Sequence, residues 1–416
     1  MTSQQVSIEA GRCLQCFDAP CISACPVNIN IPKFIGMIMT GNVIGAAEVV
    51  KTSNALANTC GQVCPEEVFC QSVCTRGKLD TPIRIRELHY HATQAEARQG
   101  FRPTLKSSAG EKRAAVIGGG PAGLACAFEL SKLGDIVDVF DSDLPGGVPR
   151  KSIPSFRLSA EDIRSDLDFV SPFVTINKQS VDRDAFEKIR GDYRAVFLAV
   201  GLGQDKSLGI RGENLPGVYP VLDVLEKAKR DAVSISPGRR VIIVGGGNVS
   251  LDVAATVKRL GAADVMLVYR RGEREMKVWK SELEEARAQG VEIRFLTIPV
   301  EIVGEGKVQG VRCRRMRLTE KYDTSGRRVP EEIPGSDCMI EADAVIVAVG
   351  QVIRTDWVSL FERTSGGLIK TQSNFETSER GVFAGGDAIS GEGTIVQSVA
   401  DGKRAAHAMH AYMATI

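Results

Sequence analysis

A dense run of cysteines near the N-terminus constrains this chain more than any other feature. The stretch CLQCFDAPCISACPVNIN, Cys13 to Asn30, spaces its four cysteines by two, four and three residues, and Pro26 follows the last one. A second run, CGQVCPEEVFCQSVC, spans Cys60 to Cys74, so eight of the eleven cysteines lie in one N-terminal segment. Such close spacing is typical of metal or cluster ligands.

Length and charge narrow the class of protein. A chain of 416 residues exceeds one core and predicts two to four domains. The formal charge of +1, from 52 basic and 51 acidic residues, gives no reason to expect nucleic acid or a membrane surface as partner. The N-terminus lacks a basic start and an apolar core, so we expect a cytoplasmic protein in which disulfides are disfavoured. Cys126, Cys313 and Cys338 are then most simply structural thiols.

The cysteine segment precedes a different kind of sequence. Residues 1–105 carry helical patterns, including a helix that follows Asn30 and has Pro32 in its first turn. The polar stretch Arg102–Lys112, with Pro and Gly, predicts a linker. Beyond it, a buried strand over Arg113–Ile117, the turn GGGPAG and a helix over Leu124–Leu133 follow in order.

The same plan occurs a second time. Arg240–Val244 predicts a strand, GGGNVS a turn and Leu251–Leu260 a helix, and each copy is followed by a strand that ends in glycine, at Gly201 and Gly350. We predict an α/β protein with an α-helical cysteine domain and two tandem Rossmann-like domains. The expected divisions are 1–105 for the cysteine domain, 106–235 for the first nucleotide domain, 236–350 for the second, and 351–416 for a tail that completes the first.

The first copy has the more complete dinucleotide signature. Gly118, Gly120 and Gly123 match G-x-G-x-x-G between strand and helix, where missing side chains let a pyrophosphate reach backbone N–H groups. Asp141 ends the next strand, where an acidic residue binds an adenosine ribose hydroxyl. The alternative is a tight turn that binds nothing.

The second copy differs at two places. Ser250 takes the third glycine position, and the next strand ends in two arginines where the first copy has an acid. A guanidinium there suits a 2′-phosphate, which favours NADP over NAD; the alternative is a solvated charge run. The candidate contacts are Gly245, Gly247, Arg270, Arg271 and, as a further cation, Lys277.

Two adjacent nucleotide sites of unlike preference indicate a flavin that exchanges hydride with a nicotinamide. That transfer needs no protein acid or base, and we identify no catalytic residue in the sequence. The nucleotide halves also lack a C-x-x-C between them, which argues against a disulfide reductase of the thioredoxin-reductase kind.

Iron–sulfur clusters would serve as one-electron acceptors for the flavin. Flavins can release electrons singly, and a closely spaced run that ends in Cys-Pro occurs in two-cluster ferredoxins, where the last cysteine ligates the other cluster. Cys13, Cys16 and Cys21 would then hold one cluster, and Cys25 would belong to the second. The remaining ligands must come from Cys60 to Cys74. Zinc is the alternative, since short C-x-x-C spacing also suits tetrahedral sites.

The motifs in this order resemble the glutamate synthase small-subunit family. The cysteine domain, VIGGGPAG, IPSFRL, GGGNVSLD, YRR and FAGGD carry the resemblance, which covers nearly the whole chain. That family includes the N-terminal half of dihydropyrimidine dehydrogenase, and the tail GTIVQSVADGKRAAHAMHAYM looks closer to this branch. The resemblance implies a module that binds FAD, oxidises NAD(P)H and passes electrons through two [4Fe–4S] clusters to a catalytic partner subunit in a hetero-oligomer.

The resemblance also implies site residues. Its FAD contacts fall on Gly118, Gly120, Pro121, Ala122, Gly123, Asp141, Gly146, Gly147, Arg157, Gly386 and Asp387, with Thr394, Ile395 and Val396 near the isoalloxazine end. Its nicotinamide contacts fall on Gly245, Gly247, Asn248, Arg270, Arg271, Lys277 and Gly350. The segment EMKVW, Glu275–Trp279, departs from the Met-Pro-Ala-like stretch of many relatives, so the entrance to the nicotinamide site is expected to differ.

For the last ligand of the second cluster, the number of cysteines and the family resemblance predict different residues. The resemblance places Cys74 with the first cluster, and Cys64 and Cys70 with Cys25 in the second, which leaves one position open. Counting cysteines would choose Cys60, whereas relatives use a Gln or Glu whose position aligns with His89. The alternative for His89 is a histidine on the helix surface.

Other functions stay open from sequence alone. One is the NAD(P)+-reducing subunit of a 2-oxoacid oxidoreductase, with electrons running in the opposite direction. Another is a stand-alone flavoenzyme that reduces a small molecule or ferredoxin, and a third is a redox-sensing protein with structural clusters. The absence of a second flavin domain and of a recognisable substrate motif favours the partner-dependent functions.

Overall fold

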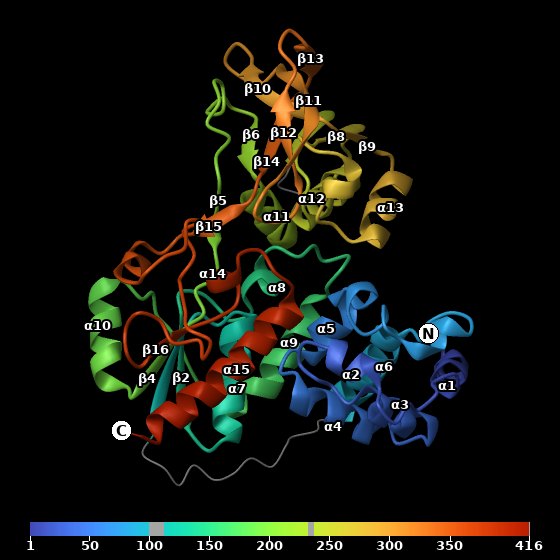
Figure 1. Cartoon of the computed structure of the whole chain (residues 1–416), viewed down its shortest axis with the longest axis vertical. Helices are drawn as coiled ribbons and strands as arrows, with labels where there is room; N and C mark the ends of the chain where they lie inside the picture. Colours follow the sequence, from blue (N-terminus) through green and yellow to red (C-terminus); the bar gives the residue numbers. More distant parts are fainter. Residues whose placement is uncertain (100–111, 232–236, 416) are drawn as a thin grey trace. The chain divides into compact units, whose positions relative to one another are not determined.

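The computed structural model describes residues 1–99, 112–231 and 237–415, and the chain divides into two compact units (Figure 1). The first unit comprises Met1–Arg150, Ser155–Leu202 and Ile353–Ile416, and the second comprises Lys151–Pro154 and Gly203–Val352. The predicted linker Arg102–Lys112 lies outside the described residues, apart from Lys112. None of the helices in the described ranges is long and apolar enough to cross a membrane.

The N-terminal part of the first unit is helical, as expected. Its elements are α1 (Ser3–Gly11), α2 (Pro20–Ala24), α3 (Ile31–Met39), α4 (Val43–Ser53), α5 (Ala57–Val63), the short 3-10 turns η1 (Glu66–Val68) and η2 (Thr75–Lys78), and α6 (Ile85–Gln99). The Asn30 side chain accepts a hydrogen bond from the Lys33 N–H at 3.1 Å and caps α3, which starts where Pro32 predicted. Phe34, Ile35 and Leu88 are fully buried between these helices.

A five-stranded parallel sheet forms the rest of the first unit. Its strand order is β16 (Val382–Ala384), β4 (Ala195–Leu198), β1 (Arg113–Ile117), β2 (Ile136–Asp141) and β3 (Thr175–Lys178). Its helices are α7 (Pro121–Lys132), α8 (Gly147–Lys151), α9 (Ala160–Val170), α10 (Arg183–Asp192), α14 (Asp387–Ser390) and α15 (Ile395–Met413), with η3 (Ser171–Phe173) and η6 (Asp356–Leu360). Strand β16 of the C-terminal tail pairs with β4 in this sheet.

Helix α15 lies directly against α7 (Figure 1). A Cβ at Gly402 would lie 2.1 Å from the Ala122 carbonyl oxygen, so the two backbones touch and only glycine fits. The capping box of Thr394 and Gln397 starts α15 at Ile395. The tail is thereby fixed against the helix that follows the first glycine loop.

The second unit repeats the parallel sheet. Its order is β6 (Val218–Pro220), β14 (Ala344–Ala348), β7 (Arg240–Gly245), β8 (Asp264–Val268) and β9 (Val291–Arg294), with helices α11 (Val221–Arg230), α12 (Asn248–Arg259) and α13 (Lys280–Ala288) and the turn η5 (Glu273–Glu275). The division differs from the expected one at residue 235, because the second unit already starts at Gly203. The reason is that β6 pairs with β14 at the edge of the second sheet.

An antiparallel sheet in the second unit was not predicted. It joins β10 (Thr297–Val303), β11 (Gly310–Tyr322), β12 (Arg328–Glu332) and β13 (Cys338–Glu341), with β11 in the centre. A separate two-stranded pair joins β5 (Gly203–Asp205) and β15 (Gln351–Ile353). Strand β11 alternates buried and exposed residues only in its first half, so its pattern in the sequence is weak.

Candidate cofactor and cluster sites

The loop between β1 and α7 has room for glycine alone. Gly118 has φ +103°, and a Cβ there would lie 2.3 Å from the Ala199 carbonyl oxygen. A Cβ at Gly123 would lie 1.9 Å from the Gly118 carbonyl oxygen. The loop can therefore expose its backbone N–H groups at the start of α7, where Gly120 is the N-cap and Pro121 and Ala122 follow.

The side chain of Asp141 is fixed beside this loop. One carboxylate oxygen accepts the Gly119 N–H at 2.7 Å, and the other accepts the Asp143 N–H at 2.9 Å. The Gly146 N–H donates to the Gly119 carbonyl at 2.7 Å, and a Cβ at Gly147 would lie 2.8 Å from Gly120 Cα. The acid and the second glycine pair thus meet at the first glycine loop, as a nucleotide site requires.

The C-terminal tail brings FAGGD to the same loop. Gly386 has φ +68°, and a Cβ there would lie 2.9 Å from the Ala122 Cβ. Asp387 is next to it, where burial raises the pKa of its carboxyl to about 6, and Ser398 Oγ donates to it at 3.4 Å. Thr394, Ile395 and Val396 form the cap and first turn of α15. Arg157 lies in the turn between α8 and α9.

The second glycine loop is as tight as the first. A Cβ at Gly245 would lie 2.2 Å from the Ala348 carbonyl oxygen. The same Cβ would lie 2.5 Å from Ser250 Oγ, so the serine at the third glycine position fills the space under the loop. Ser250 is fully buried and its hydroxyl has no hydrogen-bond partner. The incomplete glycine pattern therefore still folds into a strand–turn–helix.

The unusual EMKVW segment lies along this second loop. Gly247 and Lys277 form a parallel β-bridge, and the Asn248 side chain accepts the Trp279 N–H at 3.1 Å. The Lys277 side chain is exposed. Gly350, with φ +108°, follows β14, the strand that pairs with β7. The expected nicotinamide contacts at Gly247, Asn248 and Lys277 are thus neighbours in the fold.

The two arginines after β8 have different surroundings. Arg271 is 4% exposed, and its guanidinium donates to Asp323 at 2.6 Å and to the Arg328 carbonyl at 3.0 Å. Arg270 is exposed, and its pKa is lowered by partial burial and then by the neighbouring charges of Arg271 and Arg327. Arg271 is held by the protein itself, whereas Arg270 has cationic neighbours that an anion would compensate.

The eight N-terminal cysteines gather in two groups. The pKa of Cys21 is raised to about 12, first by burial and then by the neighbouring thiols of Cys74, Cys13 and Cys16. Burial also raises the pKa of Cys64, and the neighbouring thiols of Cys60, Cys70 and Cys25 contribute to the same shift. The first group is therefore Cys13, Cys16, Cys21 and Cys74, and the second is Cys25, Cys60, Cys64 and Cys70. Cys21 and Cys70 are neighbours between the groups.

His89 is inside the fold, unlike a surface histidine. It is 7% exposed, and burial lowers its pKa to about 4, so the ring is neutral. The imidazole is hydrogen-bonded to the backbone of Ala57, while its Nε2 is buried without a partner. A neutral ring with one nitrogen bonded to the backbone and the other unused is the usual arrangement of a metal-ligating histidine. Cys60 is also buried, near Asp166 and Cys25.

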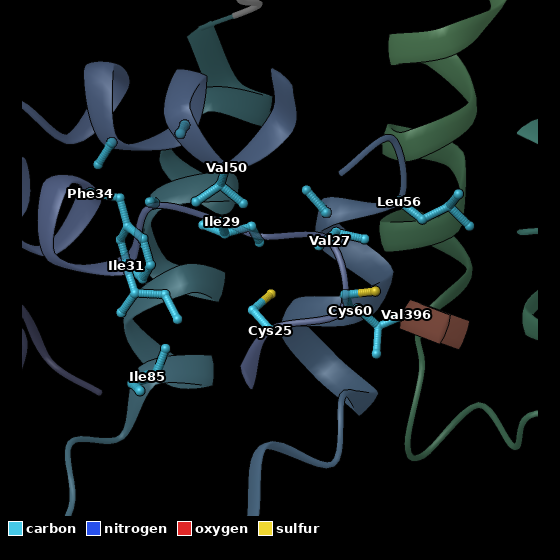
Figure 2. Packing of buried hydrophobic residues seen from close by; sticks show 14 of the residues in the cluster. Cys25, Val27, Ile29, Ile31, Phe34, Val50, Leu56, Cys60, Ile85 and Val396 are labelled. Atoms are coloured by element: carbon cyan, nitrogen blue, oxygen red, sulfur yellow. The ribbon is translucent and has the colours of Figure 1, made fainter. Parts of the chain in front are cut away.

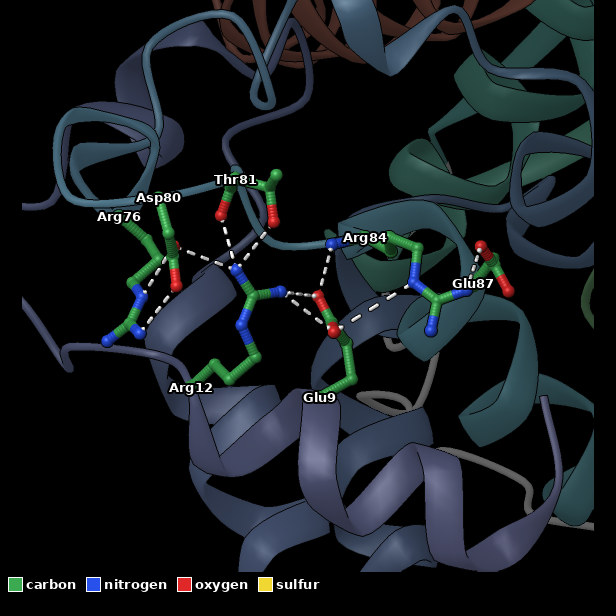
Figure 3. Close-up of polar contacts among 7 residues, drawn as sticks. All are labelled: Glu9, Arg12, Arg76, Asp80, Thr81, Arg84 and Glu87. Atoms are coloured by element: carbon green, nitrogen blue, oxygen red, sulfur yellow. Dashed lines mark hydrogen bonds and ion pairs between the residues drawn. The ribbon is translucent and has the colours of Figure 1, made fainter.

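A polar network that the sequence did not indicate ties the ends of the first group together (Figure 3). Arg12, directly before Cys13, donates to both Glu9 carboxylate oxygens at 2.8 and 2.9 Å. It also donates to Asp80 at 3.0 Å, and Arg76 donates to the same carboxylate at 2.7 and 2.9 Å. The segment after Cys74 is thus held beside the segment before Cys13.

The second group lies in a hydrophobic cluster shared with α15 (Figure 2). Cys25, Cys60 and Cys70 are buried in this cluster, and Val396 of α15 is 3% exposed within it. In the described residues, no group of three or more His, Cys, Asp or Glu side chains is arranged so that it could hold a single metal ion. In an iron–sulfur cluster the ligands bind different iron atoms.

Comparison with known proteins identifies both parts of the chain. Residues 112–413 match the pyridine nucleotide-disulphide oxidoreductase family, and residues 1–101 match the 4Fe-4S cluster domain described as dihydropyrimidine dehydrogenase domain II. The glutamate synthase [NADPH] small chain of Halomonas elongata is 34% identical over 99% of this chain and 91% of its own. The NAD-dependent dihydropyrimidine dehydrogenase subunit PreT of Escherichia coli is 35% identical over 97% and 93%.

The chain belongs to the family of the glutamate synthase small chains and the dihydropyrimidine dehydrogenase subunit PreT. It is an FAD-dependent NAD(P)H oxidoreductase subunit with a 4Fe-4S domain, and it transfers electrons. The zinc alternative is set aside, because the profile that matches the cysteine segment is that of a 4Fe-4S domain. The predicted fold class and family resemblance are confirmed.

Solved structures support the α/β fold of the nucleotide part. FprA of Mycobacterium tuberculosis, in complex with NADPH, superposes with a TM-score of 0.62 at 20% identity, over 73% of this chain and 85% of its own. The thioredoxin reductase of T. acidophilum gives a TM-score of 0.55 at 22% identity, over 72% and 99%.

Proposed function

We propose that this chain moves electrons between NADPH and a catalytic partner subunit through FAD and two [4Fe–4S] clusters. One observation carries the proposal: the first turn of α15, at Val396, is buried in the same cluster of residues as Cys25 and Cys60. The proposed flavin end of the FAD site and the second cysteine group therefore border the same hydrophobic cluster. FAD, when bound, exchanges two electrons as hydride and single electrons with clusters.

The FAD site is proposed at the first glycine loop. Backbone N–H groups around Gly118, Gly120 and Gly123 would bind the pyrophosphate, and Asp141 would accept a hydrogen bond from the adenosine ribose. The remaining proposed contacts are Pro121, Ala122, Gly146, Gly147, Arg157, Gly386, Asp387, Thr394, Ile395 and Val396. The tight packing of Gly147 and Gly386 against this loop supports the assignment.

The proposed cluster ligands follow the two cysteine groups. Cys13, Cys16, Cys21 and Cys74 would ligate the first cluster. Cys25, Cys64 and Cys70 would ligate the second, with His89 as the fourth ligand. The buried, unpartnered Nε2 of His89 supports this choice, because an orphaned buried nitrogen is costly unless something binds it. Cys60 is the competing ligand, since it lies in the second group.

The nicotinamide site is proposed at the second glycine loop, formed by Gly245, Gly247, Asn248 and Gly350. The exposed Arg270 is the proposed contact for the 2′-phosphate, with Lys277 as a second cation, and Arg271 would act by holding the loop around Asp323. The cationic neighbours of Arg270 favour an anion there and hence NADP over NAD.

A partner subunit would bind the final substrate. The relatives bear the names of chains and subunits of larger enzymes, including glutamate synthase, dihydropyrimidine dehydrogenase and, in Moorella thermoacetica, a formate dehydrogenase. Affinity purification of this protein under anaerobic conditions, followed by identification of the chain that accompanies it, would name the partner.

Metal and flavin analysis tests the proposed cofactor content. We expect one FAD and about eight iron atoms, with matching acid-labile sulfide, per chain in protein purified anaerobically. About four irons would contradict the second cluster. Zinc without sulfide would contradict both.

A further inference from the structure

Helix α5 is capped by a residue from a distant part of the chain. Leu56 occupies the N-cap position and its apolar side chain makes no capping hydrogen bond. Asp166 of α9 supplies the missing acceptor: one oxygen accepts the Asn58 N–H at 2.9 Å, and the other accepts the Thr59 N–H at 2.8 Å. The Asn58 side-chain amide donates to Asp166 at 3.0 Å as well.

The Asp166 carboxylate can satisfy these donors only because both of its oxygens accept. Asp166 is 2% exposed, and burial raises the pKa of its carboxyl to about 6, while the hydrogen bonds from Thr59 and Asn58 oppose that shift. An asparagine would offer one acceptor oxygen and would turn an N–H group toward a donor. The contact is therefore specific for a carboxylate.

The segment that Asp166 holds leads directly to the second cysteine group. Cys60 lies within α5, and Cys64 is its C-cap residue, whose N–H donates to the Cys60 carbonyl. At the other end of α5, the imidazole of His89 is hydrogen-bonded to the backbone of Ala57, the residue before Asn58. A shift in the first turn of α5 would therefore move Cys64 and turn the His89 ring.

A second carboxylate, one turn earlier on α9, contacts both α5 and α6. Asp162 accepts from the Gln62 side chain at 3.2 Å and from the Gln94 side chain at 2.7 Å. Gln62 belongs to α5 and Gln94 to α6, the helix that carries His89. Asp162 thus ties α9 to both helices through side chains, whereas Asp166 accepts from the backbone N–H groups of the first turn of α5.

We propose that Asp166 is a positioning residue for the second cluster, acting through the first turn of α5 on Cys64 and on the His89 ring. The inference rests on the proposed function, because it assumes that the second cysteine group holds a cluster. It holds whether His89 or Cys60 completes the ligand set, since α5 fixes both.

Asp166→Asn and Asp168→Asn form a matched pair that tests this role. Asp168 lies on the same helix and is exposed, so its substitution makes the same chemical change without the contact. Iron content, FAD content, and the EPR spectrum and midpoint potential of each cluster are measured in protein purified anaerobically. We expect Asp166→Asn to shift or abolish the signal of one cluster, with the other signal and the FAD content unchanged. Asp168→Asn should match the wild type, and Asp166→Glu should restore part of the signal.

Two results would overturn the role of Asp166. One is an Asp166→Asn protein with both signals and potentials unchanged, and the other is the joint loss of FAD and both clusters, which would indicate a general packing role. The wild-type protein separates this inference from the proposed function. If the wild type itself lacks a second cluster, the proposed function fails, whereas a wild type with two clusters and an unaffected variant contradicts only the role of Asp166.

Discussion

At the scale of single residues, the chemistry of the second cysteine group depends on which side chain completes it. Cys60 and His89 are both buried, but they differ in what their polar atoms contact. The Cys60 thiol lies near Asp166 and Cys25, and the His89 Nε2 is buried with no hydrogen-bond partner. Counting cysteines could not separate the two, because the difference arises from how α5 and α6 pack.

Substituting the two candidates separately tests the assignment. We expect His89→Ala to shift or abolish the EPR signal of one cluster, because the ring nitrogen would no longer bind iron. Cys60→Ser should leave both signals intact. The reverse pattern would return the second site to four cysteines.

We expect substitutions of the two arginines after β8 to have different effects. Arg270→Ala should lower the preference for NADPH over NADH by about tenfold or more, because a hydrogen bond to a charged group is worth about 1.5–3 kcal/mol. Arg271→Ala should instead lower the melting temperature, because the hydrogen bonds to Asp323 and the Arg328 carbonyl are lost. Steady-state kinetics with both nucleotides and thermal melts distinguish the variants. An unchanged nucleotide ratio in Arg270→Ala would make that arginine a surface charge.

Asp387 predicts a pH dependence of stability in flavin-free protein. Its pKa is about 6 in the folded protein against an ordinary value of 3.8, so the folded state holds the proton more tightly than the unfolded chain. The contribution of Asp387 to the free energy of unfolding therefore falls as pH rises from about 4 to 6 and is constant above that. Between pH 4.5 and 7.5, Asp387→Asn should gain about 2 kcal/mol relative to the wild type in urea unfolding. A gap that does not change with pH would contradict this.

At the scale of elements, short polar links hold distant segments of the cysteine domain together. The Arg12 network joins the end of α1 to the loop after η2, so that Cys13 and Cys74 lie close despite their separation in sequence. The glycine loops were predictable from sequence because steric exclusion of a Cβ leaves a local mark. The Arg12 and Asp166 contacts were not, because hydrogen bonds between distant segments leave no local pattern. The same holds for the antiparallel sheet around β11.

Removing the Arg12 link should affect the first cluster selectively. We expect Arg12→Ala to lower the iron bound by the first group or to alter its EPR signal, because Glu9 and Asp80 would lose their shared partner. Lys78→Ala is the control, since Lys78 is an exposed cation in the adjacent turn η2. Equal behaviour of the two variants would mean that the network does not position the cluster.

At the scale of the whole molecule, the candidate cofactor sites are distributed between the two compact units. The first unit contains both cysteine groups and the first glycine loop, where we propose that FAD binds, and the second contains the second glycine loop, where we propose the nicotinamide nucleotide. From the sequence we expected a division at residue 235, whereas the second compact unit starts at Gly203, because the pairing of β6 with β14 depends on a contact far along the chain. The division is the one expected if, as we propose, the subunit exchanges electrons with a nucleotide in one unit and with a partner chain through the other.

The most direct test of electron flow through three centres is an anaerobic reductive titration of the intact protein. With dithionite as reductant, followed by absorbance and EPR, we expect about four electron equivalents per chain: two for the flavin and one for each cluster. Addition of NADPH alone should then reduce the flavin and give an EPR signal from at least one cluster. Uptake of only about two equivalents, with no cluster signal, would contradict the account.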